Sequence, residues 1–243
     1  MTRRLALSLA VALLATASPR ASDSAAPEPA HNTLSPVEKA AGWRLLFDGR
    51  TPAGWRGFKK EGFPERGWII EDGCLRHLGD GRGGDLITVE TFSHYEFAFD
   101  WLIHPGGNSG VKYFITEERS GAIGHEYQLL GPRTQREALR TPRHQATGAF
   151  YDIAPVSTNA LPRPPGEWNH SRLIVRGHHI EHWLNGEQVL AYSLDDPVIQ
   201  ESIAASKFKD VPGFGTHFPH HLLLQDHGGD IRFRNLKLRP LEP

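Results

Sequence analysis

The sequence predicts an all-β domain, built as a jelly-roll sandwich of two antiparallel sheets. Short segments of alternating apolar and polar residues recur along the chain, and Gly, Asp, Asn and Pro separate them at short intervals. Helical periodicity is scarce. Roughly ten to twelve strands within one stretch of about 205 residues are typical of two packed sheets in a single domain.

The N-terminus is typical of an exported protein. Two arginines precede an apolar run that is too short to span a bilayer, and Ala15 and Ala17 form the small-x-small pattern of a cleavage site. Residues 1–17 therefore read as a signal peptide. Residues 18–36 are rich in Ala, Pro and Ser and predict a disordered linker, followed by the domain at 37–243. We expect the protein to be periplasmic or secreted.

Turn dipeptides indicate where the chain reverses. A hairpin is expected over residues 68–77 around Asp72-Gly73, and another over 179–192 around Asn185-Gly186, because these pairs tolerate a type I′ turn. A third hairpin is expected to turn at 227–230. Further strands are predicted at 94–103, 111–116, 125–130, 150–153, 171–176, 221–225 and 231–238. Short helices are expected near 37–41, 135–139 and 197–206.

Composition excludes several classes of partner. The formal net charge of −1 provides no basic field for nucleic acid or for anionic lipid. Past the signal segment, no apolar run is long enough to span a membrane. The single cysteine, Cys74, rules out an intramolecular disulfide and is expected to be a buried thiol. The partner is therefore expected to be small and close to neutral.

Fourteen histidines raise the question of a metal site. Four of them lie near the C-terminal turn, but the chain contains no H-E-x-x-H and no paired C-x-x-C motif. These four are His217, His220, His221 and His227. No metal ligand is therefore assigned.

Two predicted strands carry charged residues at matching positions. The period of two places Glu126 and Gln128 on one face of the segment 125–130, and Lys112 and Phe114 on one face of the preceding strand. Pairing of these strands would set Lys112 beside Glu126. Because polar strand residues usually face water, spacing alone favours a surface ion pair of little energetic consequence.

Motifs along most of the domain resemble the 3-keto-disaccharide hydrolase domain family. They run in family order, from GWRLLFDGRTPAGW (42–55) through GGNSGVKYF (106–114) and HEYQLL (125–130) to LLLQDHGGDIRFRNLKL (222–238). The resemblance implies a concanavalin A-like jelly roll. It also implies a small sugar substrate, a glycoside oxidised to a ketone at C3, and hydrolase or lyase activity toward it.

A C3 ketone acidifies the hydrogen at C2, so a base can form an enolate that expels the glycosidic oxygen before water adds. This chemistry needs a base, a donor for the enolate oxygen and an acid or cation at the leaving group. The resemblance implies Glu126 as the base, with Lys112, Asp226 and His144 as further catalytic residues. It implies sugar binding by Asp85, Asn108, Gln128, Asp152, Lys207, Gln225 and His227. No cofactor is implied.

Two alternatives stay open at this point. The same sandwich hosts noncatalytic carbohydrate-binding modules, since fold does not determine function. A lyase that depends on a divalent cation held by Asp and Glu side chains is the other alternative.

Overall fold

The all-β prediction is confirmed by a computed structural model, which describes residues 30–79, 82–157 and 161–243. The predicted signal peptide and most of the linker lie outside these residues. The strands are β1 (Arg44–Leu45), β2 (Trp55–Gly57), β3 (Trp68–Glu71), β4 (Cys74–Leu78), β5 (Leu86–Thr88), β6 (Tyr95–Ile103), β7 (Asn108–Ile115), β8 (His125–Leu130), β9 (Asn169–Arg176), β10 (His179–Leu184), β11 (Glu187–Ser193), β12 (His221–Leu224) and β13 (Asp230–Pro240). The short helices are α1 (Pro36–Ala40), α2 (Gln135–Arg140) and α3 (Pro197–Ala205). In the described part of the chain, no helix is long and apolar enough to cross a bilayer.

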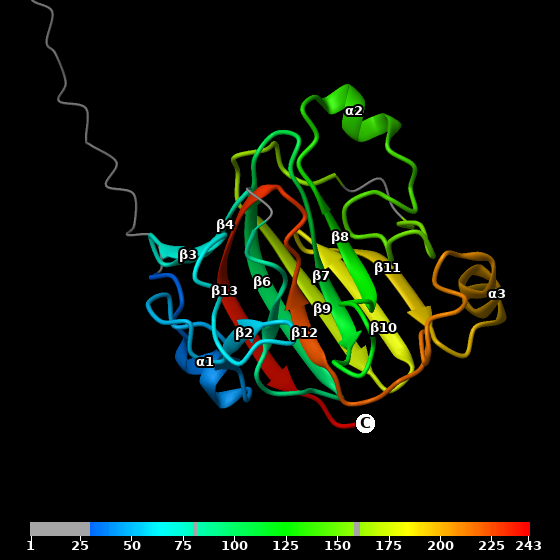
Figure 1. Ribbon diagram of the computed structural model, residues 1–243, viewed down its shortest axis with the longest axis horizontal. Helices are drawn as coiled ribbons and strands as arrows, with labels where there is room; N and C mark the ends of the chain where they lie inside the picture. Colours follow the sequence, from blue (N-terminus) through cyan, green and yellow to red (C-terminus); the bar gives the residue numbers. More distant parts are fainter. Residues whose placement is uncertain (1–29, 80–81, 158–160) are drawn as a thin grey trace, which may run out of the picture. The chain divides into compact units, whose positions relative to one another are not determined.

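The strands form two antiparallel sheets (Figure 1). The larger sheet has the order β11-β10-β9-β6-β13-β4-β3, with β1 paired to β13. The smaller sheet has the order β2-β5-β12-β7-β8. In Figure 1, strands β12, β7 and β8 lie in a layer in front of β6, β9 and β10. This is the two-sheet sandwich that the strand pattern predicts.

Two of the three predicted turns are hairpin turns. Asp72 and Gly73 have φ angles of 50° and 70°, and Asn185 and Gly186 have 50° and 90°, as a type I′ turn requires. The prediction of a third hairpin at 227–230 is wrong. That segment connects β12 in the smaller sheet to β13 in the larger one, so its glycines serve a crossing between layers.

The predicted strand at 150–153 is instead a tight turn. Within this segment the ladder is reduced to isolated bridges, in which Phe150 pairs with Tyr127 of β8 and with Ala154. Between them Asp152 has a φ of 66°, outside the extended region. The apolar residues here are buried by folding the turn back on β8.

A β-bulge changes the faces of β7. Phe114 has a φ of 55°, and the pairing with β12 shifts between His221, which faces Ile115, and Leu223, which faces Lys112. Phe114 therefore joins the core, and the expectation that it shares a face with Lys112 is wrong. Ile115 instead packs with Leu223 in a small separate cluster.

Residues before the predicted domain start at 37 are already hydrogen-bonded to the domain. The backbone N–H of Asn32 donates to Asn235 Oδ1 at 2.6 Å, and its side-chain amide donates to the carbonyl of Gly73 at 2.8 Å. Ser35 then caps α1 through the backbone N–H of Glu38. The end of the predicted linker is thus part of the fold.

A directional chain of buried polar groups joins the two sheets. The carbonyl of Gly148 can only accept, so His182 Nδ1 carries the proton at 2.7 Å and His182 Nε2 accepts from Tyr113 at 2.8 Å. Tyr192 then donates to Tyr113 at 2.7 Å and accepts from His125 Nδ1 at 2.9 Å. Tyr113 lies on β7 and His125 on β8, so these hydrogen bonds hold the two strands in place against β10 and β11.

Candidate active site

Polar side chains gather on the face of the smaller sheet that points away from the larger sheet. Register places Lys112 opposite Glu126 and Gly110 opposite Gln128 across β7 and β8. On the other side of β7, the N–H of Gln225 donates to the carbonyl of Gly110 at 3.0 Å. The same face continues to the start of β5. We call these side chains the central polar group: Asp85, Lys112, Glu126, Gln128 and Gln225.

Lys112 and Glu126 form a partly sequestered pair. Their side chains are only 13% and 12% exposed, and Nζ lies 3.6 Å from Oε2. The interpretation as an exposed surface pair is therefore wrong. Nζ has one further contact with a chain atom in the described residues, the carbonyl of Ala122 at 3.4 Å. Both contacts are long, so the ammonium retains donor capacity for a bound ligand.

The surroundings of Glu126 suit a proton acceptor. Burial raises the pKa of the Glu126 carboxyl, and the positive charge of Lys112 opposes that rise. His227 and Lys207 also act to lower this pKa, whereas Asp85 acts to raise it. A carboxylate whose basicity is raised by burial accepts a proton more readily, which suits the predicted role of Glu126 as a general base.

Gly110 makes room for the Glu126 carboxyl. A Cβ on Gly110 would lie 2.7 Å from Glu126 Oε1 and 2.9 Å from its Cδ, so Glu126 lies across this position. The sequence reasoning missed Gly110. A signal was available, since the period of two puts Gly110 on the face of Lys112.

Amide groups line the same face. Gln128 Nε2 donates to Asn108 Oδ1 at 2.7 Å, which brings these two predicted sugar-binding residues together. Gln225 is 8% exposed, and its Oε1 has no hydrogen-bond partner among the described residues. Buried acceptors of this kind usually have a partner, so Gln225 is suited to accept from a ligand hydroxyl.

Asp226 is tied to groups of the chain itself. Its Oδ2 accepts from the N–H of Gly84 at 2.8 Å, and its Oδ1 lies 2.8 Å from Nε2 of the fully buried His77. In return, the N–H of Asp226 donates to Asp85 Oδ1 at 2.8 Å. Both oxygens of Asp226 are thus engaged, which favours a positioning role over the predicted catalytic one. His77 was missed because its partner is remote in the sequence.

Three other predicted residues form a second group beside β8. Lys207 Nζ lies 3.1 Å from Asp152 Oδ2, and His144 Nε2 lies 3.9 Å from Asp152 Oδ1. The N–H of Tyr151 donates to the carbonyl of Glu126, which attaches this turn to β8. Lys207 is close enough to act on the pKa of Glu126, whereas His144 contacts the central polar group only through these neighbours.

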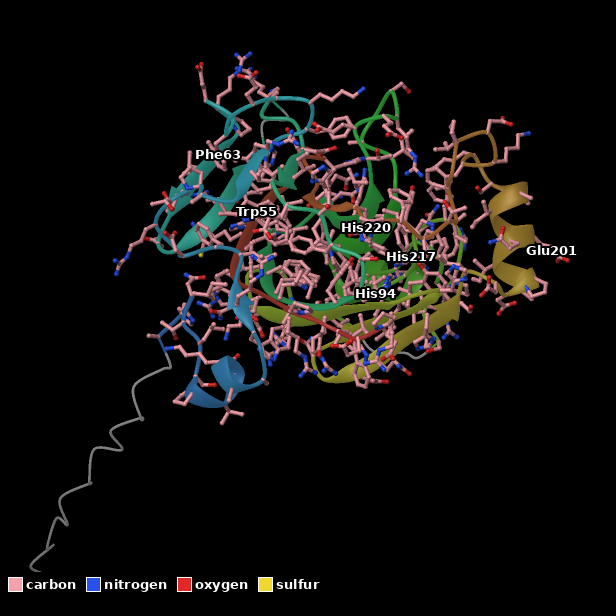
Figure 2. All side chains as sticks on the ribbon, turned by 90° about the horizontal axis from the view of Figure 1, so that it is seen from below. Trp55, Phe63, His94, Glu201, His217 and His220 are labelled. Atoms are coloured by element: carbon pink, nitrogen blue, oxygen red, sulfur yellow. The ribbon has the colours of Figure 1, made fainter. Side chains whose placement is uncertain are left out.

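Two of the four C-terminal histidines, His217 and His220, have structural partners. His217 stacks on His94 with ring centroids 4.9 Å apart, and His220 lies 3.0 Å from the Tyr95 hydroxyl (Figure 2). Across residues 30–79, 82–157 and 161–243, no three His, Cys, Asp or Glu side chains converge as metal ligands. The cation-dependent alternative stays a prediction.

With this geometry in place, comparison with known proteins identifies the class. The antiparallel sandwich is a concanavalin A-like jelly roll, and residues 42–239 match the model of the 3-keto-alpha-glucoside-1,2-lyase-like domain. The chain belongs to this family. It is 33% identical over 238 residues to a 3-keto-disaccharide hydrolase of Bacteroides thetaiotaomicron, an alignment covering 85% of this chain and 81% of that protein.

Solved structures agree. One from Parabacteroides distasonis, provisionally named a glycosyl hydrolase, matches with a TM-score of 0.78 at 30% identity, covering 88% of this chain and 100% of that one. A second with the same provisional name and organism has a TM-score of 0.64 at 24% identity, covering 82% and 99%, and supports the fold alone.

Proposed function

We propose that this protein cleaves 3-keto-glycosides by abstracting the proton at C2. The observation that carries the proposal is the sequestered pair of Lys112 and Glu126 on the face of the smaller sheet that points away from the larger sheet, with Glu126 lying across Gly110. Family membership and the name of the Bacteroides relative support the substrate class.

In the proposed reaction, the ionised Glu126 removes the C2 proton. The electron pair of the C2–H bond moves into the ring ketone and forms an enolate with charge on the C3 oxygen. When the ketone re-forms, the C1–C2 double bond appears and the C1–oxygen bond breaks, which releases the aglycone. Water then adds across the new double bond to give the free 3-keto-sugar.

Lys112 is the proposed partner of the enolate oxygen. An ammonium that is 13% exposed is partly shielded from water, so its attraction for a developing negative charge is greater than at the surface. Its two long contacts leave hydrogen-bond donors for the C3 oxygen. Gln128, Asn108 and Gln225 are the proposed partners of the sugar hydroxyls.

We also propose that the protein acts outside the cytoplasm. This rests on the N-terminal pattern of residues 1–17. N-terminal sequencing of the protein purified from its native host tests it: a mature chain beginning near residue 18 supports export, and an intact Met1 contradicts it.

One experiment separates the three candidate functions. The protein is incubated with a 3-keto-glucoside or with its unoxidised parent, each with and without a chelator, and free sugar is measured. We expect turnover of the oxidised compound alone and no effect of the chelator. Equal rates on both compounds indicate an ordinary glycosidase, loss of rate with chelator indicates cation dependence, and binding without turnover indicates a carbohydrate-binding module.

A further inference from the structure

We propose that Asp85 is the catalytic acid that protonates the departing glycosidic oxygen. This inference rests on the proposed elimination and assigns its second proton transfer. Sequence reasoning placed Asp85 among the sugar-binding residues, and Asp226 was the expected catalytic neighbour. The contacts favour Asp85 as the acid and Asp226 as the residue that positions it.

Asp85 lies on the same face of the smaller sheet as Glu126, with Gln225 of the segment after β12 between them. It directly precedes β5, where Leu86 pairs with Leu224, so Asp85 lies beside Gln225 in the next position along. Glu126 leans over Gly110 on β7. Only β12 lies between β7 and β5, so the backbones at Gly110 and Asp85 are two strand spacings apart, roughly 10 Å. The two carboxyls thus flank Gln225, and the proposal places the sugar ring above it.

The Asp85 side chain is held with one oxygen fixed and the other available. Oδ1 accepts from the N–H of Asp226, and the Asp226 carboxylate in turn accepts from Gly84 and contacts His77. The carbonyl of Asp85 accepts from the N–H of Phe58 at 2.9 Å, which anchors the backbone. Oδ2 has no hydrogen-bond donor among the described residues, so it can carry a proton toward a ligand.

The electrostatic surroundings agree with a proton donor. Burial raises the pKa of the Asp85 carboxyl, and the nearby carboxylate of Asp226 acts in the same direction. The charge of Lys112, the backbone N–H of Asp226 that donates to Oδ1, and His227 oppose the rise. Asp226 itself has no free oxygen with which to serve as the acid.

The proton balance closes over one turnover. Glu126 starts ionised and gains the proton from C2, while Asp85 starts protonated and gives its proton to the oxygen leaving C1. The products are a neutral alcohol and the unsaturated ketone. Transfer of one proton from Glu126 to solvent and of one from solvent to Asp85 restores the starting state, so no oxidant, reductant or further reactant is needed.

The leaving group tests this assignment. Methyl 3-keto-glucoside must expel a poor leaving group, whereas 4-nitrophenyl 3-keto-glucoside expels a stable phenolate that needs no proton. Asp85→Asn should lower kcat/KM for the methyl compound by on the order of 10² to 10⁴ and for the nitrophenyl compound by less than about tenfold. Equal losses on both, or none on either, overturn the proposal. Asp195→Asn, at an exposed surface contact with His178, is the matched control.

Hydrogen exchange at C2 provides a second reading. In D₂O, the Asp85→Asn variant should still exchange the C2 proton of the methyl compound faster than the rate without enzyme, because Glu126 is intact. Cleavage of the same compound should stall, and NMR follows both. Loss of exchange together with cleavage contradicts an acid role.

If Asp85→Asn fails to fold, wild-type rates over a series of phenol aglycones test the proposal. A shallow dependence of the rate on phenol acidity supports the acid, and a steep dependence overturns it. If the wild type cleaves none of these compounds, the proposed function fails instead.

Discussion

Substituting Gly110 by alanine perturbs the site through a single methyl group. The backbone of Gly110 does not have a positive φ, so an alanine fits the local conformation of β7. Its Cβ, however, would lie 2.7 Å from Glu126 Oε1, 2.8 Å from Cγ and 2.9 Å from Cδ. Real Cβ atoms do not approach other atoms so closely, and the carboxyl has to move aside.

The size of the effect follows from these distances. Restoring ordinary contact of about 3.6 Å moves the carboxyl by about 1 Å, and a misplacement of that size costs on the order of 10² in rate. Stability should change little, because an off-rotamer Glu126 costs about 1 kcal/mol and removing a strand glycine returns about 0.5 to 1 kcal/mol. We therefore expect activity to fall about a hundredfold in a folded protein.

Initial rates on 4-nitrophenyl 3-keto-glucoside, with melting temperature measured in parallel, check this prediction. Gly62→Ala is the matched control, because a Cβ there meets no atom within 4 Å and should leave the rate unchanged. Wild-type turnover by Gly110→Ala would show that the position of the Glu126 carboxyl does not matter for catalysis and would contradict its role as the base.

Three further perturbations probe other parts of the structure. Lys112→Met removes the cation that opposes the rise in the pKa of Glu126, so the acidic limb of the kcat/KM profile should move to higher pH and kcat should fall by on the order of 10²; an unmoved profile contradicts this. Arg56 lowers the pKa of Glu117 from 4.5 to about 2, so the stability lost in Glu117→Gln should be full above pH 4.5 and vanish as pH falls toward 2; a gap in melting temperature independent of pH contradicts it. Tyr113→Phe leaves the buried His182 Nε2 without a donor and should cost about 1 to 3 kcal/mol in urea unfolding; wild-type stability would contradict the hydrogen-bond chain.

Local patterns predicted most of the fold because they act over short distances. The type I′ turn at Asn185-Gly186 and the aromatic residues at every second position of β6 depend on adjacent residues alone. The period of two likewise placed Glu126 and Gln128 on one face. The bulge at Phe114 escaped prediction because a single extra residue in the pairing with β12 has no local signature.

The rest of the site depends on contacts that are remote in the sequence. His77 and Asp226 meet because β4 and the segment after β12 converge. The residues adjacent to either one contain no pattern that predicts this contact. Burial of Lys112 and Glu126 also depends on neighbouring loops, so spacing alone favoured an exposed pair. The resemblance named Asp85 and Asp226, and the different roles proposed for them rest on contacts that are remote in the sequence.

The central claim is that Glu126 removes the C2 proton, and the substitution Glu126→Gln tests it most directly. Glutamine keeps the shape and removes the base, so kcat on a 3-keto-glucoside should fall by on the order of 10² to 10⁴ with little change in substrate affinity or melting temperature. Glu201→Gln is the control, since Glu201 is exposed on α3 and extends away from the sheets (Figure 2). Near-normal turnover by Glu126→Gln, or loss of folding together with activity, would contradict the claim and make Glu126 a structural residue.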